Sequence, residues 1–521
     1  MYLIGLRSFA RGEWPFFGVD VVWTRSRIPG ALQGWVIRGP LEIWPVPEAP
    51  FVLLNVLSFA ALAALAWYLT RRAPHVPRWL VWATLLTLPW TLNYSTHVLN
   101  SSYILPGAIV FFVGFLEASP TFRAGLLPTT WAWAAMGLGL TWVMQFHMSW
   151  VLMPPYVLFA LVDVLRREPG RVIVALACLM AGAAVPGIFL IPTLLREGTS
   201  AGGLDRNVVF DPQGPDALLT IVARFLSFVA FETNRFLGVT NAERLLFLWR
   251  QPWVIPALAF ATLIGFVQPV LMLLAWFTRG DGSRLWRQVR WLTAGTLVLV
   301  YFSFFFSVRG PVAHAYFVVM PIAAFYGVMC WEACVAGRSR AGIYTRVAVV
   351  TLVAGLLMHA ALILDRLPLQ SLYRDRDLVA AAIDVRNDRF LGDRRSSSEE
   401  TVDPRPRPID PVDDPDAYVA ANPVTDLEID TVSWAPVLGN RVSRFTMQIH
   451  NRGLPAYAEV RFATTYAGTG GRTLAEREHT TRDILQPGVH RIETIDGLVP
   501  EGATSATLRV VGAERCIPLP R

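Results

Sequence analysis

Long apolar runs, separated by short charged stretches, are the feature that most limits how this chain of 521 residues can fold. Each run is about long enough for one helix to cross ~30 Å of hydrocarbon. The runs cover residues 51–70, 79–95, 103–117, 127–146, 149–165, 172–195, 252–278, 291–307, 313–336 and 347–364. Only 16% of the residues are charged, whereas a soluble chain of this length needs roughly 25% to clothe its surface. The sequence therefore predicts a polytopic α-helical membrane protein of about ten spans.

The arginines between these runs predict how the spans are oriented. On one side the connections are short and contain Arg71, Arg72, Arg78, Arg123, Arg166, Arg167, Arg171, Arg279, Arg284, Arg287, Arg290, Arg338, Arg340 and Arg346. On the other side, residues 1–50 and 196–251 are longer and mix acids with arginines. The positive-inside rule places the first side in the cytoplasm of a bacterial inner membrane and the second side outside. Because the basic residues form no stripe or arm, the net charge of +7 predicts no nucleic-acid partner.

The amino terminus conflicts with this topology. An even number of spans places both termini outside, yet residues 1–50 contain no signal peptide that would carry them there. We therefore expect the native protein to have one further span before Met1.

Four regions follow from the composition. We expect an extracytoplasmic first loop with interfacial helices over 1–50, a transmembrane domain over 51–365, a helix and disordered linker over 366–421, and an extracytoplasmic β domain over 422–521. The linker is predicted to begin with an amphipathic helix near 373–390 and then becomes rich in Asp, Arg, Pro and Ser. In the long outer loop, apolar residues from Leu218 onwards recur at helical spacing. They fit either a helix lying in the membrane interface or a re-entrant or buried connecting helix.

The carboxyl-terminal 100 residues alternate with a period of two. Phe445, Met447 and Ile449 alternate with polar residues, and glycine-rich or asparagine-rich turns separate such runs. About seven short strands predict an all-β, immunoglobulin-like sandwich. It contains no catalytic constellation, so we expect a partner-binding or spacing module.

The candidate site residues gather at the outer ends of the spans. Three histidines, His97, His147 and His314, lie there with Arg309, opposite a first loop that carries Arg7, Arg11, Asp20, Arg25 and Arg27. Arginine and histidine donors could hold a phosphate, and Asp20 could act as a general base. The alternatives are ordinary interfacial histidines and an aspartate satisfied within a turn. Neither these histidines nor the four cysteines have the spacing of a zinc site.

Several of these stretches together resemble bacterial C-type (GT-C) membrane glycosyltransferases, a group that includes protein mannosyltransferase-like enzymes and the lipid A aminoarabinose transferase. The resemblance covers roughly residues 1–365. It is carried by residues 7–18 (RSFARGEWPFFG), Tyr94-Ser95 through Pro106, the Gln145-Phe146-His147 turn, and Gly310-Pro311 through Tyr316.

The resemblance implies a helical membrane fold with an active site at the outer leaflet, using a polyprenyl-phosphate-linked sugar donor and an acceptor outside the cytoplasm. By position, Arg309 and His314 would hold the donor phosphate, Gln145 and His147 would line the cavity, and Tyr316 would belong to the same site. A divalent metal ion could assist. The acidic motif of the family lies just upstream of where this chain begins, so Asp20 stands in for it.

Two other functions compete with a glycosyltransferase. One is a non-catalytic membrane scaffold or assembly protein of the cell envelope that presents the β-sandwich to partners. The other is a lipid-linked oligosaccharide transporter or polymerase, which is disfavoured because charges in the middle of the spans are nearly absent.

Overall fold

The chain forms two compact units in a computed structural model, Met1–Arg386 and Asn387–Arg521. The structure describes residues 1–21, 26–198, 210, 218–232, 236–237, 241–278, 283–307, 313–335, 341–366, 379, 382–383, 386, 409, 421–437, 442–481, 484–488, 490–498, 500 and 502–516. Most of the linker, including nearly all of the predicted helix at 373–390, lies outside these residues. Each unit is described separately below.

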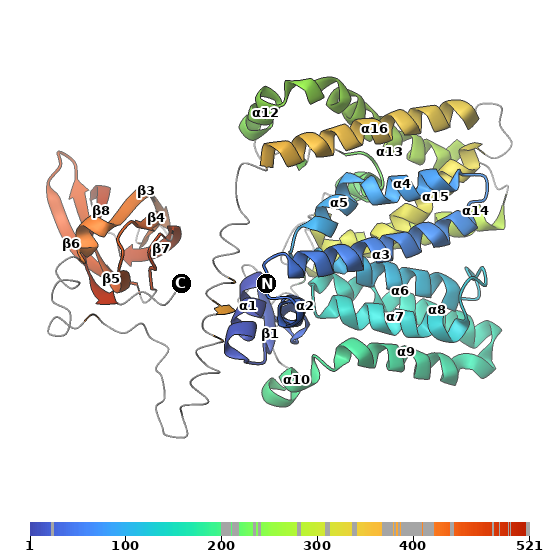
Figure 1. The fold of residues 1–521 in the computed structure, drawn as a ribbon, viewed down its shortest axis with the longest axis horizontal. Helices are drawn as coiled ribbons and strands as arrows, with labels where there is room; N and C mark the ends of the chain where they lie inside the picture. Colours follow the sequence, from blue (N-terminus) through green and yellow to red (C-terminus); the bar gives the residue numbers. More distant parts are fainter. Residues whose placement is uncertain are drawn as a thin grey trace. The chain divides into compact units, whose positions relative to one another are not determined.

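Within the residues described, the regular elements of the first unit are helices and one short β-hairpin (Figure 1). Its elements are α1 (Tyr2–Arg11), β1 (Phe17–Val21), β2 (Ser26–Pro29), α2 (Leu32–Ile43), α3 (Ala49–Arg72), α4 (Arg78–Thr87), α5 (Pro89–Thr96), α6 (Ile104–Ala118), α7 (Thr129–Met144), η1 (Met148–Leu152), α8 (Pro154–Arg167), α9 (Val172–Gly187), α10 (Ile191–Glu197), α11 (Leu218–Ser227), α12 (Asn241–Arg250), α13 (Ile255–Thr278), α14 (Arg284–Ser303), α15 (Met320–Val335) and α16 (Ala341–Arg366). Short 3-10 turns, among them η7 (Ala313–Ala315), connect some of them.

Seven helical segments within the described part of the chain are long and apolar enough to cross a membrane. They are Ala49–Arg72, Met148–Arg167, Pro169–Gly187, Pro252–Thr278, Arg284–Phe306, Phe317–Cys334 and Gly342–Asp365. This agrees with the predicted helical membrane architecture. The other three predicted spans are also helical but shorter or broken: α6 has 15 residues, α7 has 16, and the run at 79–95 forms α4 and α5. The count of ten spans therefore stays a prediction.

Two predicted boundaries shift for physical reasons. The run at 79–95 breaks because Pro89 cannot continue the hydrogen bonding of α4. The Thr91 hydroxyl donates to the carbonyls of Leu85 and Leu88, both at 2.9 Å, and so satisfies groups exposed by the break. The helix predicted at 291–307 instead begins at Arg284, because arginines on its first turns can extend along the helix towards the aqueous edge.

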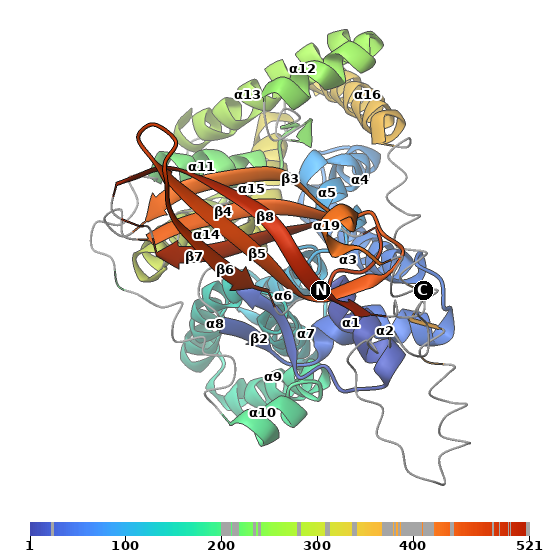
Figure 2. The ribbon, with the colours of Figure 1, turned by 90° about the vertical axis from the view of Figure 1, so that its left-hand side faces the viewer.

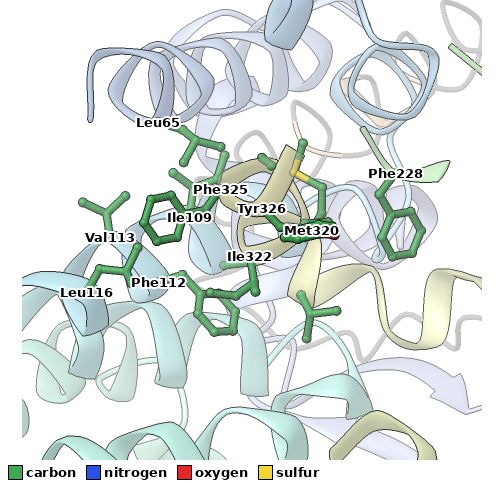
Figure 3. Close-up of a cluster of buried hydrophobic side chains, with 14 of the residues drawn as sticks. Leu65, Ile109, Phe112, Val113, Leu116, Phe228, Met320, Ile322, Phe325 and Tyr326 are labelled. Atoms are coloured by element: carbon green, nitrogen blue, oxygen red, sulfur yellow. The ribbon is translucent and has the colours of Figure 1, made fainter. Parts of the chain in front are cut away.

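The core of this unit is formed by helices far apart in sequence. Figure 3 shows Leu65 of α3, several residues of α6 including Phe112, and Ile322 and Phe325 of α15 packed together. All four of these side chains are at most 2% exposed. The three helices therefore form the centre around which the rest of the bundle is arranged.

Helix α11 packs on the bundle with one face, which buries Ile221 and Phe225, while Leu218 and Leu219 on its first turn are 49% and 82% exposed. It packs against α13, α14 and α15, between which Figure 2 places it. The turn after α11, residues 228–231, packs closely against glycines in the middle of α13, α15 and α16. A Cβ at Gly265 would meet the Phe231 carbonyl oxygen at 2.7 Å, one at Gly327 would meet Val229 at 3.1 Å, and one at Gly355 would meet the Phe231 ring at 2.7 Å. One buried face and an exposed apolar first turn fit both sequence interpretations, so the interfacial helix and the re-entrant or buried connecting helix both stay predictions.

A dense polar layer joins the helices at their arginine-rich ends. Glu117 is fully buried and accepts hydrogen bonds from the Tyr68 hydroxyl (2.9 Å) and from the backbone N–H groups of residues 124–126 (2.8–3.2 Å). Asp163 accepts from the Ser119 hydroxyl at 2.6 Å and pairs with Arg167 at 2.8 Å. Both buried carboxylates therefore have their hydrogen-bond partners within the protein, and they hold the helix ends to the adjoining loops.

The second unit contains two three-stranded antiparallel sheets, ordered β3-β4-β7 and β6-β5-β8. The strands, shown in Figure 2, are β3 (Leu427–Val437), β4 (Val442–Asn451), β5 (Ala456–Gly468), β6 (Thr473–Thr480), β7 (His490–Leu498) and β8 (Ala503–Cys516), with a short helix α19 (Pro423–Asp426) before them. Met447 and Ile449 of one sheet share a buried cluster with Val460 and Phe462 of the other. The alternation in the sequence is thus the alternation of buried and exposed faces, whereas the immunoglobulin-like topology stays a prediction.

Candidate functional site

The amino-terminal elements pack on the end of the bundle opposite the arginine-rich layer, and one buried amide is among the groups that hold them there. Gln33 of α2 donates from Nε2 to the carbonyl oxygens of Gln145 (3.0 Å) and Phe146 (3.2 Å), while its Oε1 accepts the Val19 N–H at 3.0 Å. Its side chain is fully buried. Because every polar position of this amide is used, Gln33 ties strand β1 to the turn after α7.

A second contact fixes the β1–β2 hairpin at the same place. Gly30 has a φ of +108°, a conformation that residues with a side chain rarely adopt, and a Cβ there would lie 2.3 Å from Gln145 Oε1. Gln145 is fully buried, and its Nε2 donates to the Pro186 carbonyl at 2.7 Å. Its Nε2 is therefore engaged at this junction, whereas its buried Oε1 has no hydrogen-bond partner among the described residues.

His147 follows this turn and caps the next helix. Its Nδ1 accepts the Ser149 N–H at 3.1 Å, at the start of η1. An Nδ1 that accepts a backbone proton belongs to a ring whose own proton is on Nε2. Burial, and secondly the nearby His314, lower the pKa of His147 to about 3. The ring is therefore neutral at physiological pH, with one N–H to donate.

The structure brings His147 and His314 together, although 166 residues separate them. Their ring centroids are 6.1 Å apart and their planes are nearly perpendicular (87°). His314 lies exposed in η7, whereas Tyr316, two residues on, is fully buried between Phe228 and Phe304 at ring distances of 5.6 and 5.9 Å. One exposed imidazole and one neutral imidazole thus face each other beside an aromatic wall.

The other predicted site residues that the structure describes are not shown in contact with the paired histidines. His97 is exposed at the end of α5, where its Nδ1 lies 2.9 Å from the Asn93 carbonyl oxygen and 3.2 Å from the Thr96 hydroxyl, both in its own helix. Arg7 and Arg11 are exposed on α1, and Arg27 is exposed on β2.

The backbone of Asp20 pairs with that of Arg27 in the hairpin. The Asp20 side chain and the whole of Arg25 and Arg309 lie outside the described residues.

The sequence interpretation missed an ion pair between Arg224 and Glu232, whose side chains are 23% and 25% exposed. Arg224 of α11 pairs with Glu232, at 2.6 Å to Oε2, and the Trp90 indole N–H donates to the same oxygen at 3.1 Å. Phe228 connects this pair with the histidines, because its ring contacts both Trp90 (5.0 Å) and Tyr316 (5.6 Å). The sequence does offer one indication of this pair: Arg224 and Glu232 are eight residues apart in a largely apolar stretch, where opposite charges usually pair.

The described carboxylates, histidines and cysteines contain no group of three or more that could hold a metal ion. The polar side chains that the structure brings together here are the His147 and His314 imidazoles and the Ser149 hydroxyl, which lies 3.1 Å from His147 Nδ1.

No known protein-family model matches the chain, and no curated protein matches it. Among solved structures, the chain is similar to the arabinosyltransferase EmbB from Mycobacterium smegmatis, at 10% sequence identity and a TM-score of 0.36. The alignment covers 99% of this chain and 62% of the EmbB chain, so the chain spans less than two-thirds of the length of that protein.

Proposed function

We propose that this protein is a membrane glycosyltransferase that moves a sugar from a polyprenyl-phosphate donor to an acceptor outside the cytoplasm. The observation that carries the proposal is the pairing of His147 with His314, at 6.1 Å between ring centroids, at the end of the bundle where the amino-terminal elements dock. Two of the three predicted outer histidines thus lie close enough to bind one headgroup, which supports the proposal.

The proposed roles follow from the charge that each group can supply. His314 is exposed and, with Arg309, would hold the donor phosphate by charge-assisted hydrogen bonds. His147 is neutral and would donate its Nε2–H to a sugar or phosphate oxygen. Asp20 would remove the proton from the acceptor hydroxyl or amine as its oxygen or nitrogen bonds to the anomeric carbon of the sugar. The bond from that carbon to the phosphate oxygen breaks, and polyprenyl phosphate leaves with the electron pair.

Sugar release from a radiolabelled polyprenyl-phosphate donor by the purified full-length protein tests this function. We expect turnover by the wild type, a loss of tenfold or more with Arg309→Ala or His314→Ala because a charged hydrogen bond is removed, and a loss of about 10²–10⁴ with Asp20→Asn. If the wild type neither binds nor turns over the donor, the protein is not this enzyme.

The matched control is His75→Ala. His75 is an exposed histidine at the arginine-rich end, where it pairs with Glu332, and in the variant Glu332 keeps the hydrogen bond from the backbone N–H of residue 75 at 3.0 Å. We expect it to leave turnover unchanged. If Asp20→Asn alone retains activity, the base lies elsewhere, and Glu232→Gln is then the next substitution to make.

A further inference from the structure

A cavity of about 550 Å³ lies away from the paired histidines, between α6, α8 and α14. Its volume is in the range of small-molecule sites, about 300–1,000 Å³. Most of its wall is apolar, with aromatic side chains that include Phe115, Phe122, Phe159 and Trp291. At the end where α8 finishes and α14 begins, the lining residues are Arg167, Arg284 and Arg287, and the lining contains no carboxylate.

The polar groups in the floor of the cavity are already satisfied. The hydroxyls of Tyr156 and Thr296 bond to each other at 2.7 Å, and Gln288 Nε2 donates to the Thr121 carbonyl at 2.7 Å. Arg167 pairs with Asp163 at 2.8 Å, so its charge is partly used. The groups left for a ligand are therefore the exposed guanidinium groups of Arg284 and Arg287 and a long apolar surface.

The dimensions fit one membrane lipid. From Arg284 to Leu299 the lining follows α14 for about 22 Å, at 1.5 Å per residue. One leaflet of hydrocarbon is about 15 Å deep, half of the ~30 Å core. The groove is thus long enough for an acyl chain and the headgroup above it, with the headgroup at the arginines.

We propose that this groove binds one anionic phospholipid of the leaflet on the arginine-rich side, with its phosphate held by Arg284 and Arg287 and one acyl chain along α14. The site is separate from the paired histidines, so it is independent of the sugar-transfer proposal. Two guanidinium groups can hold the lipid phosphate, and their positive charge favours a headgroup of net negative charge over a zwitterionic one, because the described lining contains no carboxylate.

Native mass spectrometry of the full-length protein in detergent, titrated with phosphatidylglycerol or phosphatidylcholine, tests the proposal. We expect one phosphatidylglycerol molecule to bind more tightly than phosphatidylcholine. The double variant Arg284→Gln/Arg287→Gln should bind it about 30-fold more weakly, since an arginine near a membrane surface contributes about fivefold and two are removed. The control Arg78→Gln/Arg166→Gln removes two exposed arginines at the same end that do not line the groove and should leave binding unchanged.

A second variant tests the acyl chain without changing charge. A Cβ at Gly295, which lines the groove, would meet no atom within 4 Å, so Gly295→Leu projects its side chain into open space and suits a helix better than glycine. We expect it to abolish retention of the lipid. Equal binding of the two lipids, unchanged binding by either groove variant, or displacement of the lipid by glycerol 3-phosphate would each overturn the proposal.

Discussion

His147 shows how one residue can be fixed in a single protonation state by local geometry. Its Nδ1 accepts the Ser149 N–H, so protonation of that nitrogen would break the cap of η1. The pKa of His147 is lowered to about 3 from an ordinary value near 6.5, by burial and by His314. The unfolded chain therefore binds more protons than the folded chain between these two values, and the folded state is destabilised as the pH falls below about 6.5.

This gives a measurable pH dependence. Above pH 6.5 the contribution of His147 to stability is fully present, and below it at most about 1.4 kcal/mol is lost per pH unit. His147→Asn keeps a capping side chain but cannot titrate. We expect the thermal unfolding midpoint in detergent to fall more steeply from pH 7 to pH 4.5 in the wild type than in this variant. Parallel curves would show that His147 does not carry the effect.

The sequence identified the paired histidines of the site, but not the residues that hold the surrounding elements together. His147 and His314 are at span ends, where sidedness alone places them on one face, and the structure adds that they are neighbours. Gln33 and Glu232 could not be predicted, because their roles depend on partners 112 and 142 residues away in the chain. A polar residue in a loop looks the same in sequence whether it faces water or ties two elements together.

At the scale of elements, apolar length predicts where helices are but not how they end or pack. The runs at 51–70 and 347–364 became α3 and α16, because nothing within them interrupts helical hydrogen bonding. The break at Pro89 depends on the Thr91 hydroxyl to satisfy the exposed carbonyls, which is a tertiary detail. The position of the turn after α11 depends on glycines that follow it in the chain by 30 residues or more, so the periodicity of α11 alone leaves two interpretations open.

The packing of α11 predicts the effect of adding one methyl group. In Gly265→Ala the new Cβ would lie 2.7 Å from the Phe231 carbonyl oxygen, a backbone atom that cannot move easily. We expect a loss of about 1–3 kcal/mol in stability, as for overpacking of a core. The measurement is the thermal midpoint in detergent, and the control is Gly342→Ala of α16, where a Cβ would meet no atom within 4 Å. Equal midpoints for the two variants would contradict this packing.

At the scale of the whole molecule, the two ends of the helical unit differ in chemistry. One end has the layer of Glu117, Asp163 and their partners, together with most of the loop arginines. The other has the docked amino-terminal elements and the paired histidines. The positive-inside rule predicts that the first end is cytoplasmic and that the β unit, which follows α16, is outside.

Cysteine labelling in intact cells tests this orientation. In a background without the four native cysteines, Leu99→Cys and Leu454→Cys introduce thiols at residues that are 50% and 84% exposed. We expect both to react with a membrane-impermeant maleimide. Gly170→Cys, in the exposed connection between α8 and α9, should react only after the membrane is permeabilised. Labelling of Gly170→Cys in intact cells would reverse the orientation.

The burial of the turn after α11 also has a consequence for synthesis of the protein. The ten residues of α11 span only about 15 Å, half of a hydrocarbon core, and the glycines that receive the turn after it lie in α13, α15 and α16. The ribosome makes all three of those helices later. In the nascent chain, α11 and the turn after it therefore lack their packing partners until α16 has been made. We expect chains that end before residue 355 to be substrates for membrane quality control.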